Sequence, residues 1–130
     1  MVINEYRRWK EEKKINKLWL SPKNIFPTDK LNNQAKVYHD ICDSVVANGF
    51  NYEHPVTVIK SDGSFLIFDG HKRISAAIKS NLNLIPCKLI SRNDPAFGLK
   101  IEFIFSTFDQ AKIDEWELIH GFKFLETINN

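Results

Sequence analysis

The chain has 130 residues, of which 43% are hydrophobic and 26% charged, a composition typical of one soluble globular domain and not of a disordered or fibrous protein. The formal net charge is only +2, which argues against a strongly basic nucleic-acid-binding protein but leaves room for a local basic patch. No apolar run approaches the roughly 20 residues that cross a bilayer, and the first residues lack the order of a signal peptide. We therefore expect a cytoplasmic protein without a membrane partner.

The N-terminal segment, residues 2–17, has six basic and three acidic side chains, a local charge of +3. It is predicted to be a helix, either an amphipathic docking helix or a solvated one. Residues 17–20 are predicted to form a short strand. The Ser21-Pro22 pair ends it, and a loop is expected as far as Pro27 because each proline favours extended geometry in the residue before it.

The middle of the chain has clear periodicity. Residues 35–48 are predicted to be a helix with one buried face and with Gly49 as its stop, because apolar side chains recur at Tyr38, Ile41, Cys42 and Val45. Residues 55–60 alternate like a strand. The Asp-Gly pair within residues 61–64 predicts a hairpin that leads into a second strand at 65–68.

The C-terminal third is predicted as strand, strand and helix. Residues 84–90 read as a strand in which Pro86 marks an edge or a strand start. Residues 101–105 alternate like a strand, although a loop is also compatible with them. Asp109 is a candidate N-cap for a helix over 110–120, and residues 109–126 carry a local charge of −3. The two cysteines have no CxxC spacing, so reduced, buried thiols are expected.

The stretch from Phe65 to Ile78 carries the most chemical information. Four apolar residues are followed by Asp69-Gly70 and then by a helical pattern, which predicts strand, tight turn and helix. Glycine permits positive φ and a close approach of a ligand to the backbone. The first helical turn holds His71, Lys72 and Arg73, although the helix dipole disfavours cations there. A bound anion, such as phosphate, would explain the pattern, and a solvated surface turn is the alternative.

With these features in place, residues 18–90 resemble the N-terminal domain of the ParB and sulfiredoxin superfamily. The shared parts are a Leu-Ser-Pro segment, a helix ending in Asn-Gly, a Pro-Val-Thr-Val strand, a hairpin, Phe-Asp-Gly-His-Lys-Arg-Ile-Ser-Ala-Ala and an Ile-Pro-Cys strand. The resemblance implies an α+β fold, a small mixed sheet with helices packed around it. Residues 1–130 would be a single domain, with a basic segment at 1–17 and a helical extension at 91–130.

The Gly70-x-x-Arg73-x-x-Ala76 pattern is similar to the phosphate-binding box of partition CTPases, sulfiredoxins and ParB-like serine kinases. His71 stands where sulfiredoxins have their catalytic cysteine, so repair of cysteine sulfinic acid is not expected. Partition proteins have glutamate there and a long DNA-binding region afterwards. The form seen here instead looks like that of the free-serine kinases, whose general base is a carboxylate on the loop after the first strand. In Phe26-Pro-Thr-Asp29 the nearest match is Asp29.

The resemblance assigns candidate roles to seven residues. Catalytic candidates are Asp29, Asp69 and His71, and the nucleotide or phosphate candidates are Gly70, His71, Lys72, Arg73 and Ser75. Asp69 could bind a metal or a substrate hydroxyl, or simply stabilise the turn through its side chain, and Ser75 could be a buried helix residue. Glu53-His54 could reach the same crevice, with Glu53 as a second candidate base, or have no role. His39 and His120 are expected to be structural, and no residues are assigned as a metal site.

The expected function is therefore binding of ATP, ADP or CTP, with Mg²⁺, and possible phosphotransfer to a small hydroxylated substrate such as an amino acid. The alternatives are a non-catalytic nucleotide-binding or regulatory module, and a partition-type NTPase that acts with a DNA-binding partner. A protein partner or a homo-oligomer is compatible with the charged ends. Sequence-specific DNA binding by the chain alone is not expected.

Overall fold

The structure, a computed structural model, describes residues 17–32 and 34–124. The helix expected over residues 2–17 thus lies almost wholly outside the described residues. In chain order the elements are β1 (Lys17–Leu20), the 3-10 helix η1 (Pro22–Asn24), β2 (Ile25–Phe26), α2 (Lys36–Asn48), β3 (Val56–Ser61), β4 (Ser64–Asp69), α3 (His71–Lys79), β5 (Ile85–Ile90), α4 (Gly98–Thr107) and α5 (Gln110–His120).

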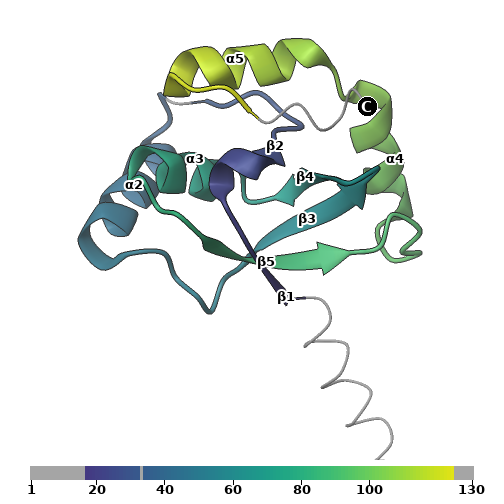
Figure 1. Cartoon of the computed structure of the whole chain (residues 1–130), viewed down its shortest axis with the longest axis horizontal. Helices are drawn as coiled ribbons and strands as arrows, with labels where there is room; N and C mark the ends of the chain where they lie inside the picture. Colours follow the sequence, from purple (N-terminus) through teal and green to yellow (C-terminus); the bar gives the residue numbers. More distant parts are fainter. Residues whose placement is uncertain (1–16, 33, 125–130) are drawn as a thin grey trace, which may run out of the picture.

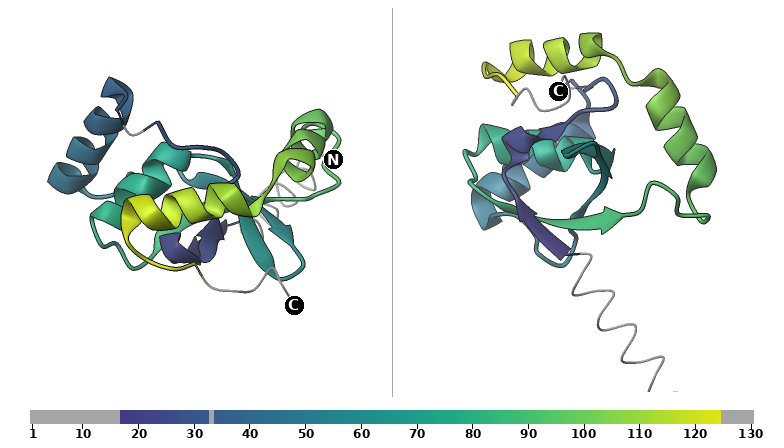
Figure 2. Two further views of the ribbon diagram at one scale, coloured as in Figure 1. Left: turned by 90° about the horizontal axis from the view of Figure 1, so that it is seen from above. Right: turned by 45° about the vertical axis from the view of Figure 1, so that its right-hand side comes forward.

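The five strands form one mixed sheet in the order β1-β5-β3-β4-β2. β1 is antiparallel to β5, β5 is parallel to β3, β3 is antiparallel to β4, and β2 is parallel to β4. Helices α2 and α3 lie together at one side of the sheet, α4 lies at the opposite side, and α5 passes over β2 (Figures 1 and 2). This confirms the small mixed sheet with surrounding helices that the sequence predicts.

Both faces of the sheet are covered, and neighbouring residues of a strand contribute to different cores. On β3, Val58 belongs to the main core with Ile74 of α3, whereas the next residue, Ile59, packs with Ile101 and Ile104 of α4. All three of Val58, Ile59 and Ile74 are fully buried. Alternation along the strand therefore fixes α3 to one face and α4 to the other.

Two sequence predictions are corrected by the structure. Residues 101–105, predicted as a strand, belong to helix α4, because Ile101 and Ile104 are the residues that it buries and their spacing of three is helical. The loop predicted up to Pro27 contains η1 and the short strand β2, which pairs with β4. Pro86 is the second residue of β5 and lies opposite Trp19, in agreement with a strand start and not with an edge, since β5 lies between β1 and β3.

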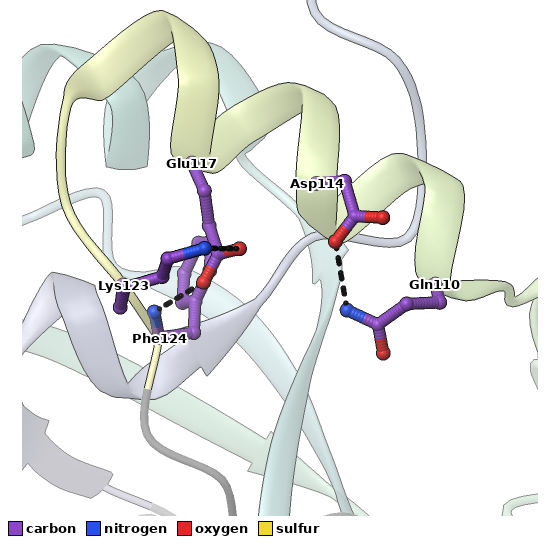
Figure 3. A network of polar contacts seen from close by, with 5 residues as sticks. All are labelled: Gln110, Asp114, Glu117, Lys123 and Phe124. Atoms are coloured by element: carbon purple, nitrogen blue, oxygen red, sulfur yellow. Dashed lines mark hydrogen bonds and ion pairs between the residues drawn. The ribbon is translucent and has the colours of Figure 1, made fainter.

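The C-terminal helix is capped as predicted and is followed by a segment that folds back onto it. The Asp109 carboxylate accepts a hydrogen bond from the Lys112 amide at 3.1 Å, and Gly121 ends α5 in the left-handed region. Glu117 then accepts the Phe124 amide at 2.8 Å and pairs with Lys123 at 3.5 Å, beside a hydrogen bond within α5 between Gln110 and Asp114 (Figure 3). These contacts hold Phe124 in the main core, where it contacts Phe26.

Both cysteines are free thiols; Cys87 is buried and Cys42 is partly buried. Burial raises the pKa of the Cys87 thiol to about 12. Among the described helices, none is both long enough and apolar enough to cross a membrane.

Candidate functional site

The turn between β4 and α3 requires a glycine. Gly70 has φ +113°, in a region that other residues rarely adopt, and a Cβ placed there would come within 2.6 Å of Val56 Cγ1 and 3.1 Å of Arg73 Nη2. Backbone conformation and space therefore both exclude a side chain at this position. The tight packing against β3 directs the chain from Asp69 straight into α3.

The first turn of α3 has unused donors. Gly70 occupies the N-cap without a side-chain cap, and there is no acidic residue in the first turn. The Gly70 carbonyl accepts the Ile74 amide at 2.9 Å. The amides of His71, Lys72 and Arg73 have no hydrogen-bond partner among residues 17–32 and 34–124. Three free amides and the positive end of the helix dipole therefore point out of the N-terminus of α3.

His71 faces inward and is not a cation at neutral pH. Its Nε2 accepts a hydrogen bond from the Thr28 amide at 3.1 Å, and its ring meets that of Trp116 edge-on at 5.9 Å. Burial lowers the pKa of His71 to about 4, although the Asp29 and Asp69 carboxylates act to raise it. Of the three cations expected from the sequence, Lys72 and Arg73 thus remain. The neutral imidazole of His71 joins the turn to the loop that carries Asp29.

The Asp29 loop, residues 27–32, is held against the start of α3 from two directions. Thr28 donates its hydroxyl to the Ile67 carbonyl at 2.6 Å, and Trp116 of α5 donates its indole N–H to the Asp29 carbonyl at 3.0 Å. The Asp29 side chain is exposed and accepts the Lys30 amide at 2.8 Å. A pocket of about 360 Å³, the smaller of two adjoining spaces, lies between the Asp29 loop and the Gly70 turn. It is lined by Asp29, Lys30, Leu31, Asn32, Ile41, Asp69, Gly70, His71, Lys72 and Arg73.

Ser75 lies in the core, away from this pocket. Its side chain is fully buried, and its Oγ is 2.8 Å from Tyr38 Oη and 2.6 Å from His120 Nε2. The His120 ring stacks on Trp116 at 5.1 Å, and its Nδ1 lies 2.9 Å from the Trp116 carbonyl. Burial lowers the pKa of His120. This chain of contacts connects α2 and α5 to α3. Ser75 and His120 therefore stabilise the packing of these helices.

A larger cleft of about 1180 Å³ adjoins the smaller pocket, and the two share Ile41, Asp69 and Arg73. The Arg73 guanidinium donates a hydrogen bond to the His54 carbonyl, which holds it at the junction. Further lining residues come from α2, from the segment that follows it and from strands β1 and β5: Lys17, Ser44, Val45, Gly49, Phe50, Asn51, Tyr52, Glu53, His54, Pro55 and Lys88.

The structure thus brings together six of the seven candidates, all but Ser75, and places Glu53 and His54 in the adjoining cleft. Sequence reasoning missed Lys17, Lys88 and the contribution of Trp116. The lysines are 71 positions apart, and only the pairing of β1 with β5 makes them neighbours. No group of three or more potential metal ligands is found within the described part of the chain.

No protein-family model matches the chain, and no curated protein matches it significantly by sequence. Among solved structures, free serine kinase in complex with AMP matches with a TM-score of 0.53 at 18% identity, over 62% of this chain and 33% of the kinase. ParB from Caulobacter crescentus, complexed with CTP-gamma-S, matches with a TM-score of 0.52 at 18% identity, over 79% and 59% of the two chains. The chain has the ParB and sulfiredoxin fold.

Sulfiredoxin from Arabidopsis thaliana also matches, with a TM-score of 0.49 at 24% identity, over 64% of this chain and 96% of that protein. The ParB and sulfiredoxin fold predicted from residues 18–90 is confirmed. This chain spans about a third of the free serine kinase and 59% of the ParB chain.

Proposed function

We propose that this domain binds a nucleotide with its phosphates at the Gly70 turn and transfers a phosphoryl group to a small hydroxylated acceptor. The observation that carries the proposal is the uncapped N-terminus of α3, whose free amides open into a pocket lined by Lys30, Lys72 and Arg73. Helix N-termini with nearby cations bind phosphate oxygens. Two proteins of the same fold, free serine kinase and ParB, have been solved with AMP and CTP-gamma-S respectively.

Arg73 is the proposed principal phosphate ligand. Its guanidinium is oriented by the His54 carbonyl and lines both the smaller pocket and the larger cleft. Because an arginine fork matches phosphate oxygens in two places, it binds them more strongly than a single point charge would. Lys72 adds charge on the same turn, and neutral His71 holds the turn in place from behind.

Asp29 is the proposed general base. A base must come within hydrogen-bond reach of the acceptor hydroxyl, directly or through one water. Asp29 lines the same pocket as the phosphate turn, and Trp116 and Thr28 fix its loop. Glu53 lies in the larger cleft and is the second candidate.

Asp69 lines both the smaller pocket and the larger cleft, and its side chain makes no hydrogen bond or ion pair with any described residue. The Asp69 side chain therefore does not stabilise the turn through a hydrogen bond to any described residue. Mg²⁺ is typically held by one or two carboxylates together with substrate phosphates. Asp69, beside the phosphate turn, fits that requirement, and the ion would neutralise phosphate charge there.

The second candidate function is a nucleotide-binding module that phosphorylates no acceptor, either a non-catalytic or regulatory module or a partition-type NTPase domain that acts with a DNA-binding partner. One observation favours it: an Asp29 oxygen already accepts the Lys30 amide, so this oxygen is engaged within its own loop. Both candidates share the nucleotide site and differ only in whether an acceptor is phosphorylated.

Calorimetric titration with ATP, ADP and CTP, with and without Mg²⁺, tests the shared claim. We expect Arg73→Ala to weaken binding by about tenfold or more, the loss of a charge-assisted pair. The matched control is Arg92→Ala, because Arg92 is exposed and lies outside both spaces, over the Phe105 ring. Equal affinity in Arg73→Ala and the parent, or no binding below millimolar, contradicts the proposal.

Turnover separates the two functions. With ATP and a mixture of hydroxylated amino acids, phosphorus NMR would show a new phosphomonoester if the protein is a phosphotransferase. Asp29→Asn should bind ATP like the parent and transfer at least 100-fold more slowly, in line with the loss of a general base. Nucleotide binding without a phosphomonoester supports the module.

A further inference from the structure

Lys17 and Lys88 begin a row of partner positions that crosses the sheet toward the phosphate turn. Lys17 of β1 lies opposite Lys88 of β5, Lys88 pairs with Thr57 of β3, and Thr57 pairs with Asp69 of β4. Gly70 follows Asp69 directly. Residues that face each other across neighbouring strands project from the same side of the sheet, so the Lys17 and Lys88 side chains are neighbours there.

This lysine pair carries an electrostatic cost that no ion pair within residues 17–32 and 34–124 relieves. Like charges directly opposite on neighbouring strands are destabilising. Both lysines are exposed, and neither ammonium group forms an ion pair or a hydrogen bond with a described residue. Both line the larger cleft. An anionic group seated between them would offset their repulsion.

The larger cleft has room for a ligand in addition to the phosphates. Its volume, about 1180 Å³, exceeds the usual range for one small ligand, roughly 300–1,000 Å³. Ile41 and Phe50 give its wall an apolar part. Tyr52, also in the lining, packs against Trp19 at 5.5 Å. The cleft lining therefore combines the lysine pair, an apolar part and Arg73 of the phosphate turn.

We propose that Lys17 and Lys88 form an anion subsite for the acceptor, which is a small hydroxylated molecule carrying a carboxylate or phosphate. The inference rests on the proposed function, because it places the acceptor beside the nucleotide site. Strands lie about 4.8 Å apart, so the backbone of Lys88 is roughly 10 Å and that of Lys17 roughly 14 Å from Asp69 along the row. The reactive hydroxyl and the anion of the acceptor are thus several bonds apart.

Three probes with one carbon skeleton test this subsite: glucose 6-phosphate, gluconate and neutral glucose. Each is titrated into the full chain by calorimetry, with ATP titrated separately. We expect at least one anionic probe to bind tenfold or more tightly than glucose, the equivalent of one charge-assisted contact. Preference for glucose 6-phosphate identifies the anion as phosphate, and preference for gluconate identifies it as carboxylate; either supports the subsite.

Variants assign the effect to the lysine pair. Lys17→Gln and Lys88→Gln should each weaken the anionic probe by about tenfold and leave ATP affinity unchanged. Lys60→Gln is the matched control, since Lys60 is an exposed strand lysine on β3 outside both spaces. All three changes are at exposed positions, and circular dichroism verifies folding.

The subsite is wrong if the anions bind no better than glucose, or if Lys60→Gln weakens them as much as the other variants do. It is also wrong if the lysine variants weaken ATP and not the anion, because the pair would then hold the nucleotide. A failure of the nucleotide proposal is seen separately, as the absence of ATP binding that depends on Arg73.

Discussion

Lowering the pH should destabilise the protein through His71 more than through an ordinary histidine. In the folded chain the pKa of His71 is lowered to about 4, mainly by burial, against an ordinary value of 6.5. Between these two pH values the unfolded state binds a proton that the folded state does not. The contribution of His71 to the unfolding free energy is therefore fully present above pH 6.5 and is lost as the pH falls toward 4.

The magnitude follows from the difference between the two pKa values. At about 1.4 kcal/mol per pH unit, the loss of unfolding free energy between pH 7 and pH 4 is about 3 kcal/mol from this one side chain. That is a large fraction of the roughly 5–15 kcal/mol that stabilises a typical domain. Protonation of Nε2 also removes the acceptor for the Thr28 amide, so the Asp29 loop should loosen over the same range.

Urea unfolding from pH 4 to pH 7.5, followed by tryptophan fluorescence, measures the effect. His71→Gln is the comparison, because it cannot titrate and keeps a side chain that accepts a hydrogen bond. His120, whose pKa is also lowered, is present in both proteins, so its contribution cancels. We expect the stability advantage of the parent over His71→Gln to shrink by about 3 kcal/mol as the pH falls. An advantage that is independent of pH would refute the reasoning.

Three further expectations concern the turn, the thiols and DNA. Gly70→Ala should cost about 1–3 kcal/mol of backbone strain in urea unfolding, with more from the contact with Val56, and an unchanged unfolding midpoint would contradict it. A thiol reagent should label Cys42 well before Cys87, whose sulfur is buried and whose pKa is raised to about 12; equal rates in the native protein would count against the packing. Fluorescence anisotropy should show little binding to random duplex DNA at physiological salt and no sequence preference, whereas salt-resistant, selective binding would restore the partition-type reading.

The strand, turn and helix around Gly70 could be predicted because the signals are local. A buried apolar run, an Asp-Gly turn and a change to helical period all fall within residues 65–78, and the structure has β4, the positive φ of Gly70 and α3 there. The cap of α5 by Asp109 is local in the same way. Elements whose signals lie within one turn or one strand are the ones that sequence periodicity resolves.

The sequence predictions were wrong or incomplete where the structure depends on contacts between residues far apart in the chain. In residues 101–105 the apolar residues satisfy both a strand and a helix pattern, and packing of Ile101 and Ile104 against Ile59 selects the helix. The orientation of His71 depends on Thr28, 43 residues earlier, and the hold of Trp116 on the Asp29 loop spans 87 residues. Sequence periodicity gives no indication of contacts between residues so far apart in the chain.

The most direct test of nucleotide binding at the Gly70 turn is the amide NMR spectrum of the full chain during titration with ATP and Mg²⁺. Phosphates seated on the N-terminus of α3 should shift the amides of His71, Lys72 and Arg73 the most, because those donors have no partner within the described chain. The amides of the Asp29 loop should follow at the same ATP concentrations. Shifts confined to α4 or to the far end of the sheet, or no shifts at millimolar ATP, would contradict the account.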